Sequence, residues 1–468
     1  MHFQELQIRA KLKKKVLGWA VVEKARRRQN ARATNLKEGD ANTKYFHLKS
    51  NARRRKNFIQ SLKTERGWAV THEDKKRIIN NHFSAIMDSP PPRTSDFIWE
   101  HLHLPAVDLS SLDAPFTEQE VLAAIMGLFF KTCWETIKMD IMAALNSFHS
   151  LRCEDLNLLN SASVVLVPKK DGAETVHDFR PISLIHTFAK IISKILTIRL
   201  APRMDELIVP CQSAFIKGRS IHDNFLYVRN IARRFHQNKM PALLMKLDIS
   251  KAFDSVRWDF LLDLLQKRGF PTRWRHWIAA TLASSTSRIL LNGIPSEPIL
   301  HGRGLRQGDP LSPLLFILAM DPLHRLFSKA TDLGLLSKVG GRLLRFRVSM
   351  YADDAAVFIK PTKKDIDNLA QILIEFGNAT GLHTNINKTT VTPISCASID
   401  LDHLLQALPM ARANFPIKYL GLLLTVRRLR KTEFRPLLDK AMAKISSWHG
   451  RHLTQAGRVC LAKSVLTS

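Results

Sequence analysis

In the last two thirds of the chain, the pattern of hydrophobic and polar residues predicts strands that alternate with helices. A β-branched run at residues 163–167 ends at Pro168, and residues 169–172 then give a turn signal. These features predict a hairpin, with Phe179 on its return strand. Residues 187–200 repeat apolar side chains at helical spacing, so an amphipathic helix is expected there.

A second strand is expected to lead directly into a helix. Residues 243–249 form a short apolar run with Asp248 near its end. Asp254-Ser255 then offers a cap for a helix over residues 258–265.

Two further elements contain acidic residues at their ends. Residues 310–327 predict a helix, with Asp309 as its cap and Pro310 at the first helical position. Residues 345–360 alternate apolar and polar side chains on both sides of a polar tip, Tyr351-Ala352-Asp353-Asp354, which is typical of a hairpin. The absence of an internal repeat argues against a solenoid.

The composition adds a strong positive charge to this folding pattern. The formal net charge is +30 and the pI is about 10.2, so a polyanionic partner is expected, either nucleic acid or an anionic membrane. A hydrophobic content of 45% excludes a disordered chain. Residues 1–60 hold 17 Lys and Arg against 4 acidic residues, and this region suits a nuclear address, a nucleic-acid contact or a solvated helix face.

Cysteine spacing and hydropathy exclude several classes of protein. The 5 cysteines show no CxxC pairing, which argues against a thiolate zinc site and a disulfide framework. No apolar run approaches the ~18 residues of a membrane span, and the N-terminus lacks the apolar region of a secretory signal. We therefore expect a soluble intracellular chain that meets nucleic acid and not a membrane.

The candidate chemistry lies in three carboxylates. Asp353 and Asp354 are adjacent at the tip of an apolar hairpin, and Asp248 lies near the end of another apolar strand. If the two strands are neighbours in one sheet, the carboxylates converge and suit hard divalent cations such as Mg²⁺. Two such ions ~4 Å apart would activate a hydroxyl for phosphoryl transfer. An exposed acidic turn without a ligand is the alternative.

Ordered motifs resemble those of reverse transcriptases. Tyr351-Ala352-Asp353-Asp354 resembles the YxDD box, residues 247–254 resemble the first aspartate motif, and residues 304–313 resemble the RQGDPLSP motif between them. The runs PKK at 168–170, FRPISL at 179–184 and QSAFIKGR at 212–219 resemble the fingers of LINE-type (non-LTR) retrotransposon reverse transcriptases, particularly the plant kind. The resemblance covers about residues 40–468.

This resemblance implies a right-hand polymerase of α+β class, with fingers, a ferredoxin-like palm, a truncated helical thumb and a basic helical N-terminal region. The implied parts are a linker region that follows the endonuclease in the family, a partial fingers extension, the reverse transcriptase domain of fingers and palm, and the start of the thumb. Their ranges are 1–90, 91–148, 149–424 and 425–468. Only Met126-Gly127-Leu128 stands where the family has a KAPGPDG-type stretch, so a deletion in the fingers is expected.

The resemblance also assigns the metal ligands. Asp248 and Asp353 would be the main ligands, Asp354 would complete the pair, and the backbone carbonyl of Ile249 would add a further oxygen. The expected cofactor is a pair of Mg²⁺ ions, with Mn²⁺ as the alternative.

Other residues are assigned to the substrates, which are an RNA template, a DNA primer and dNTPs. Lys169 and Arg180 would hold the triphosphate, and Phe253 would exclude a 2′-OH. Gln307 and Gly308 would lie beside the template base and the nascent pair, Lys388 would be a general acid for pyrophosphate, and Tyr419-Leu420-Gly421 would be the primer grip. Without the resemblance, Lys169 and Arg180 could be solvated basic side chains, Phe253 could be a core residue, and Gln307-Gly308 could be part of an ordinary turn.

Three functions remain open on the sequence. The first is an RNA-directed DNA polymerase of a retroelement, which would act in the nucleus or the cytoplasm, the nucleus being expected from the family's role. The second is an inactive remnant that binds nucleic acid through its charge, and the third is a maturase-like RNA-binding protein. The PKK and FRPISL runs favour the LINE type over the maturase.

Overall fold

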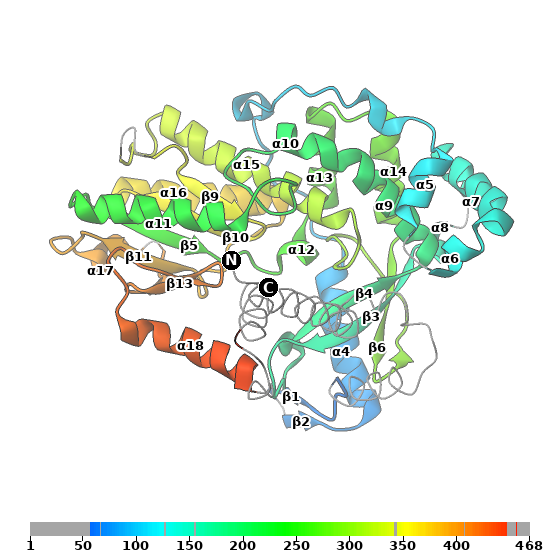
Figure 1. Cartoon of the computed structure of the whole chain (residues 1–468), viewed down its shortest axis with the longest axis horizontal. Coiled ribbons are helices and arrows are strands. Elements are labelled where there is room, and N and C mark those ends of the chain that lie inside the picture. Colours follow the sequence, from blue (N-terminus) through cyan, green and yellow to red (C-terminus); the bar gives the residue numbers. More distant parts are fainter. Residues whose placement is uncertain are drawn as a thin grey trace, which may run out of the picture.

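The computed structural model describes residues 57–65, 67–125, 128–153, 156–340, 344–406, 408–446 and 455. The predictions for the basic residues 1–56, for the deletion at residues 126–127 and for most of the thumb after residue 446 lie outside the described residues. Within them, helices and strands are mixed, and two five-stranded sheets lie side by side (Figure 1). The expected α+β class is therefore confirmed.

The first sheet contains the strands on which the acidic residues were predicted. Its order is β12 (Ala411–Arg412), β11 (Thr390–Ile394), β5 (Ala242–Leu247), β10 (Asp354–Ile359) and β9 (Val348–Tyr351). β5 runs antiparallel to both of its neighbours, and Leu247 lies opposite Ala355. The prediction that these two strands are neighbours is confirmed.

Both faces of the first sheet are buried. Leu243, Met245 and Leu247 of β5 point into the larger core, which also holds apolar residues of α13 (Trp258–Lys267), α15 (Ser312–Asp332) and α16 (Lys363–Thr380). Leu244 points the other way, toward α11 (Ile221–Gln237) and the hairpin of β13 (Ile417–Tyr419) and β14 (Leu422–Leu424). Burial on both faces explains why β5 is a continuous apolar run.

The second sheet lies beside the strand ends of the first. Its order is β4 (Phe179–Ile185), β3 (Ser161–Pro168), β6 (Thr286–Leu291) and β7 (Ile294–Pro295), and β8 (Ile299–Leu300) also pairs with β6. The antiparallel pairing of β3 with β4 confirms the predicted hairpin. Ile79, Phe83 and Ile86 of α4 (His72–Met87) pack against one face of this sheet.

The remaining elements surround these two sheets. The predicted helix over residues 187–200 is confirmed as α9 (Thr187–Leu200), whose buried apolar stripe faces the larger core. Among the described residues, no helix is both long and apolar enough to cross a membrane. The other elements are β1 (Leu62–Thr64), β2 (Gly67–Ala69), η1 (Trp99–Leu102), η2 (Ser110–Asp113), α5 (Glu118–Ala124), α6 (Leu128–Thr132), α7 (Trp134–His149), α8 (Leu156–Leu159), η3 (Val176–Asp178), η4 (Ala201–Arg203), α10 (Met204–Leu207), α12 (Ala252–Ser255), α14 (Thr272–Ala283), α17 (Leu401–Leu404) and α18 (Lys431–Ser446).

One predicted helix start and one predicted helix cap differ from the structure, whereas α13 begins at Trp258 as predicted. α15 begins at Ser312 and not at Pro310, because the Asp309 carboxylate accepts hydrogen bonds from the Leu311 and Ser312 amides. Asp309 therefore still caps the helix, from a position further upstream. Asp254 lies inside the short helix α12 and does not cap α13, whose N-cap residue is Arg257.

Candidate active site

The three predicted carboxylates meet at one end of the first sheet. Asp248 follows the last residue of β5, and Asp354 is the first residue of β10. The register that pairs Leu247 with Ala355 brings Asp354 beside Asp248 on the neighbouring strand. Asp353 lies in the two-residue turn between β9 and β10, because Tyr351 pairs with Asp354 across that turn.

The negative charges of these three carboxylates repel one another, and nearby positive charges among the described residues offset this repulsion only in part. Burial raises the pKa of Asp248, and the negative charge of Asp354 raises it further against the opposing effect of Lys388. The pKa of Asp353 is raised by loss of hydration and by the charges of Asp354 and Asp248. Among the described residues, only Asp354 of the three forms an ion pair, at 3.5 Å from Lys246 Nζ to Asp354 Oδ1. A cation at Asp248 and Asp353 would relieve the repulsion.

The carboxylates do not form a complete cage for one ion. In the part of the chain that the structure describes, no three His, Cys, Asp or Glu side chains are placed to hold a metal ion, so the three carboxylates lie near one another without forming the predicted three-carboxylate metal site. The ion pair between Asp354 and Lys246 accounts for part of this difference. Mg²⁺ is usually bound by one or two carboxylates together with water and substrate phosphates. Two strand-end carboxylates therefore suit it.

The backbone beside Asp248 leaves one more oxygen for such an ion. Ile249 forms an isolated bridge with Thr384. The hydrogen bonds of this bridge run from Ser250 N to His383 O at 2.8 Å and from Asn385 N to Asp248 O at 2.7 Å. The carbonyl of Ile249 takes no part in either bond. Its predicted use as a ligand is compatible with this geometry.

A cleft of about 680 Å³ lies in front of Asp248 and Asp353. Its walls come from β4 of the second sheet, from α4, α12 and the start of α15, and from the loops that hold Lys169, Asp248, Gln307, Asp353 and Lys388. The predicted site residues in its lining are Lys169, Arg180, Asp248, Ile249, Phe253, Gln307, Gly308, Asp353 and Lys388. Residues that lie far apart in the sequence thus share one cleft.

Cations line the same cleft as the carboxylates. Burial lowers the pKa of Lys169, and the positive charges of Lys388 and Arg180 lower it further. Lys169 Nζ donates one hydrogen bond to the His177 carbonyl at 2.7 Å, which leaves other donors of the ammonium group for a ligand. A cleft that holds both carboxylates and crowded cations suits an anionic substrate that binds together with metal ions.

Phe253 is held between the cleft and the core. Its side chain is half-buried and stacks on Phe316 of α15, with ring centroids 4.4 Å apart and an interplanar angle of 17°. Phe253 therefore packs as a core residue and also forms part of the cleft wall. The stacking agrees with a core phenylalanine, and the sugar contact stays a prediction.

The turn at Gln307 and Gly308 rests against the second sheet. Ser183 N of β4 donates to the Gln307 carbonyl at 3.0 Å. Gly308 has a φ of +108°, and a Cβ atom there would lie 2.9 Å from the Ser183 carbonyl oxygen. The absence of a side chain at Gly308 therefore lets the turn pack closely against β4, and its place beside the template base stays a prediction.

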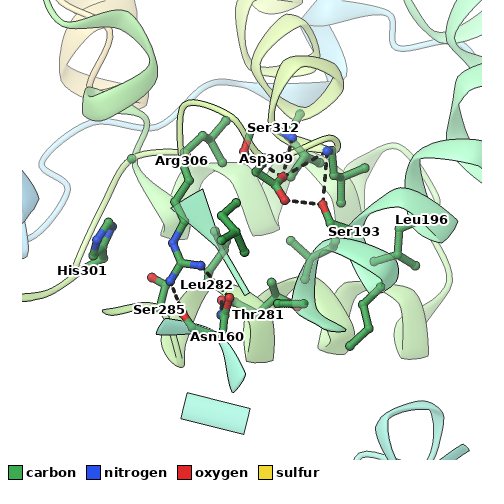
Figure 2. A pocket seen from close by; sticks show the side chains of 18 residues that line it. Asn160, Ser193, Leu196, Thr281, Leu282, Ser285, His301, Arg306, Asp309 and Ser312 are labelled. Carbon is green, nitrogen blue, oxygen red and sulfur yellow. Dashed lines mark hydrogen bonds between the residues drawn. The ribbon is translucent and has the colours of Figure 1, made fainter. Parts of the chain in front are cut away.

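Buried polar contacts fix both sides of this turn (Figure 2). Arg306 donates to the side chain of Asn160 at 2.6 Å and to the Thr286 carbonyl at 3.2 Å, which ties the turn to β6 and to the residue before β3. Asp309 accepts from the hydroxyl groups of Ser193 and Ser312. These residues line a small cavity of about 40 Å³ behind the turn, so they have a supporting role.

His301 lines the same small cavity, and its burial makes a prediction about acid stability (Figure 2). Burial and the charge of Arg306 lower the pKa of His301 to about 3, from 6.5. The unfolded chain therefore binds more protons between these values, and the free energy of unfolding falls as the pH drops through 6.5. His301→Gln should reduce this loss by roughly 2 kcal/mol between pH 7 and pH 4.5. Urea unfolding at both pH values measures it, and equal losses in both proteins would contradict the assignment.

The predicted primer-grip residues lie outside the cleft lining. Tyr419, Leu420 and Gly421 form the tip of the β13–β14 hairpin, with positive φ values of 46° at Leu420 and 82° at Gly421. Tyr419 is buried against Ala356 and Phe358 of β10. The hairpin is therefore attached to the strand that begins with Asp354, but its tip is not part of the cleft that holds the carboxylates and the cations.

Sequence analysis gave no catalytic or binding role to two residues of this site. Asp254 lies in the cleft, where burial raises its pKa to about 6, and it accepts hydrogen bonds from Gln307 Nε2 at 3.5 Å. His82 of α4 reaches the same cleft, and burial and its neighbours His177, Lys251 and Lys169 lower its pKa to about 4. Asp254 lies in a recognised motif, but no local pattern pointed to His82.

Family comparison agrees with the arrangement of this site. Residues 167–424, more than half of the chain, match the family "Reverse transcriptase (RNA-dependent DNA polymerase)". This range holds all the predicted site residues from Lys169 to Gly421. The chain belongs to the reverse transcriptase family, and it is of the non-LTR retrotransposon type.

Three relatives give the extent of the similarity. The chain is 26% identical over 454 residues to the Transposon TX1 uncharacterized 149 kDa protein of Xenopus laevis, a match that covers 92% of this chain and 34% of that protein. It is 31% identical over 227 residues to a Pol polyprotein from the Drosophila melanogaster element R2DM, a match that covers 48% of this chain and 21% of that protein. It is 41% identical over 69 residues to the uncharacterized mitochondrial protein AtMg01250 of Arabidopsis thaliana, a match that covers 14% of this chain and 57% of that protein. The chain thus spans about a third or less of the two transposon proteins.

Proposed function

We propose that the protein is an RNA-directed DNA polymerase that transfers a nucleotide from a dNTP to the 3′-OH of a primer. The observation that carries this proposal is the cleft that holds the Asp248 and Asp353 carboxylates together with Lys169, Arg180 and Lys388. Members of the family require a nucleic-acid template and primer together with dNTPs. For this chain, the proposed partners are an RNA template and a DNA primer, and its net charge of +30 favours both polyanions.

The proposed metal ligands are Asp248, Asp353 and the Ile249 carbonyl, with Asp354 beside them. Reverse transcriptases generally use divalent metal ions, and the oxygen donors here suit Mg²⁺, with Mn²⁺ as the alternative. When bound, two such ions make the attacking hydroxyl more acidic and neutralise charge on the phosphates. The raised pKa values of Asp248 and Asp353 support this assignment, because they come first from burial and then from neighbouring carboxylates, and a bound cation would offset both effects.

We assign the basic residues of the cleft to the triphosphate. Lys169 and Arg180 lie on the β3–β4 hairpin, and Lys388 is close enough to lower the pKa of Lys169. These cations would stabilise the negative charge that moves toward the leaving pyrophosphate. Lys388 is also the proposed general acid. Its positive charge lowers the pKa of both Lys169 and Asp248, so it lies near the proposed triphosphate site and near the carboxylates.

The proposed sugar contact of Phe253 predicts a change in nucleotide selection. The ring projects into the cleft from α12 and is supported by Phe316, so it would oppose a 2′-OH by contact. Phe253→Ala should raise rNTP incorporation relative to dNTP incorporation by about 10- to 100-fold. Single-nucleotide extension with a dNTP and the matching rNTP measures the ratio. Phe253→Tyr keeps the bulk and should keep the wild-type ratio, and an unchanged ratio in Phe253→Ala would refute the contact.

Gln307, Gly308 and the β13–β14 hairpin are assigned to the nucleic acid. Gln307 is oriented by Asp254, and Gly308 offers a backbone without a side chain at the edge of the cleft. We propose that these two residues lie beside the template base and the nascent pair. Tyr419-Leu420-Gly421 is the proposed primer grip, which its attachment to β10 supports.

The helices and strands can be assigned to the subdomains of a right-hand polymerase. We assign residues 149–424 to the fingers and palm, with the second sheet in the fingers and the first sheet as a ferredoxin-like palm. α18 would begin the thumb in residues 425–468, residues 1–90 would form the linker region, and residues 91–148 would form the fingers extension with its predicted deletion. The motif spelling and the similarity to the Arabidopsis protein support a plant-type element. The nucleus is its proposed place of action.

The experiment that tests the proposed function is primer extension on an RNA template. A polymerase should extend a DNA primer on RNA when Mg²⁺ is present. A folded protein that binds the primer–template but adds no nucleotide would instead be an inactive remnant. Selective binding of an intron RNA without extension would favour the maturase-like interpretation.

A further inference from the structure

A buried amide holds the turn that contains Asp353. Gln212 lies in the segment between α10 and α11, and its residue is 0% exposed. Its Oε1 accepts hydrogen bonds from the Ala352 amide and the Ala214 amide, both at 3.0 Å. Its Nε2 donates to the Ala352 carbonyl at 3.2 Å. One side chain therefore satisfies both backbone groups of Ala352.

The turn needs such support because of its backbone conformation. Ala352 has a φ of +53° at the first position of a two-residue hairpin turn, where glycine is the usual residue. A non-glycine residue in this region costs about 1 to 3 kcal/mol and persists where its surroundings determine the conformation. The two backbone hydrogen bonds to Gln212 supply that constraint. Asp353, the next residue, is placed by the same turn.

Gln212 is itself fixed on both sides. The Met350 amide donates to the Cys211 carbonyl at 2.8 Å, and the Ser213 amide donates to the Met350 carbonyl at 3.2 Å, so the segment pairs with β9. The buried side chain of Asn224 donates to the Cys211 and Met350 carbonyls at 3.1 and 2.6 Å. This pairing keeps Gln212 in register with the turn.

Arg219 supports the same segment from its outer side. Its guanidinium donates to the carbonyls of Gln212 at 2.7 Å, Val209 at 2.8 Å and Ile208 at 2.9 Å. Gln212 is therefore a rigid support, and the strained turn is the part that depends on it.

We propose that Gln212 is a positioning residue for the polymerase reaction, and this inference rests on the proposed function. It lies behind the turn and not in the cleft lining, so it acts through Ala352 on the placement of Asp353. Loss of its amide would let the turn relax toward a negative φ. The Asp353 carboxylate would then leave its position beside Asp248.

Hydrogen exchange tests the contact without reference to activity. In the wild type, the Ala352 amide should exchange at least 10-fold more slowly than an unprotected turn amide, because Gln212 Oε1 accepts its proton. In Gln212→Leu, this protection should be lost, while the amides of β5 stay protected. Gln237→Leu, an exposed change on α11, is the matched control and should leave the Ala352 amide protected. Free exchange of that amide in the wild type would overturn the proposal.

Kinetics then separates positioning from a general effect on folding. Gln212→Leu should lower kcat for dNTP addition by about 10- to 100-fold, while the KM for dNTP and the Kd for the primer–template stay within about twofold. Gln212→Glu, which keeps the size and one acceptor, should fall between the wild type and Gln212→Leu. An equal loss of kcat and primer–template affinity, with an unchanged Ala352 amide, would overturn the proposal. Gln212-dependent protection in a protein without polymerase activity would refute the proposed function and leave the contact established, with no reaction for it to serve.

Discussion

An Asp353→Asn variant is expected to add dNTPs on the order of 10³-fold more slowly than the wild type. The amide has nearly the size of the carboxylate, so the turn between β9 and β10 should keep its shape. What is lost is the negative charge beside Asp248, and with it the attraction for a divalent cation. Single-turnover extension of a labelled primer measures the rate of the chemical step.

The matched control for this variant is Asp332→Asn. Asp332 is the exposed last residue of α15 and lies outside the cleft lining. Its replacement by asparagine is the same chemical change as in Asp353→Asn. It should keep the wild-type rate within about twofold, as an exposed substitution does. A rate for Asp353→Asn within threefold of the wild type, with primer–template affinity unchanged, would remove Asp353 from the catalytic assignment.

Asp321→Ala is expected to lower the free energy of unfolding by about 3 to 5 kcal/mol. Asp321 and Arg268 are both 0% exposed in their side chains, and their ion pair joins α15 to the end of α13. Arg325 forms a second ion pair with the same carboxylate, which also accepts from the Val209 amide at 3.0 Å. Burial opposes ionisation of Asp321, but the two arginines outweigh it and hold its pKa below the usual range.

The large effect of this change comes from the charges it leaves behind. Without the carboxylate, the guanidinium of Arg268 would stay buried without a counter-charge, which costs more than the lost contact itself. Asp332→Ala on the same helix removes an exposed carboxylate and should change stability by less than about 0.5 kcal/mol. Urea unfolding followed by tryptophan fluorescence measures both. Equal stabilities of the two variants would show that the buried pair does not contribute as argued.

Local sequence patterns predicted much of the fold around the site. The apolar run of β5, the alternation of the β9–β10 hairpin and the helical spacing of residues 187–200 each express a single local period, and all three were confirmed. Asp248, Asp353 and Asp354 were predicted to converge only if the two strands are neighbours, and no local pattern supplies that condition. The structure brings them to the same end of the sheet without forming a three-carboxylate metal site among the described residues.

Features that depend on tertiary contacts were not predictable from local patterns. The start of α15 was misplaced because Asp309 reaches the helix from three residues upstream, through a contact network that includes Ser193 of α9. Asp254 reads as a helix cap in the sequence, but it is buried in the cleft beside Gln307. Gln212 lies in a recognised motif, yet its contact with Ala352 spans 140 residues of sequence. No local period records such a contact.

The most direct test of the polymerase assignment is dNTP incorporation on poly(rA) primed with oligo(dT). The wild type should incorporate dTTP only when Mg²⁺ or Mn²⁺ is added, and an Asp353→Ala, Asp354→Ala double variant purified in the same way should incorporate none. Equal incorporation by the double variant would indicate a contaminating polymerase. A folded wild-type protein that binds this primer–template and incorporates nothing would contradict the account.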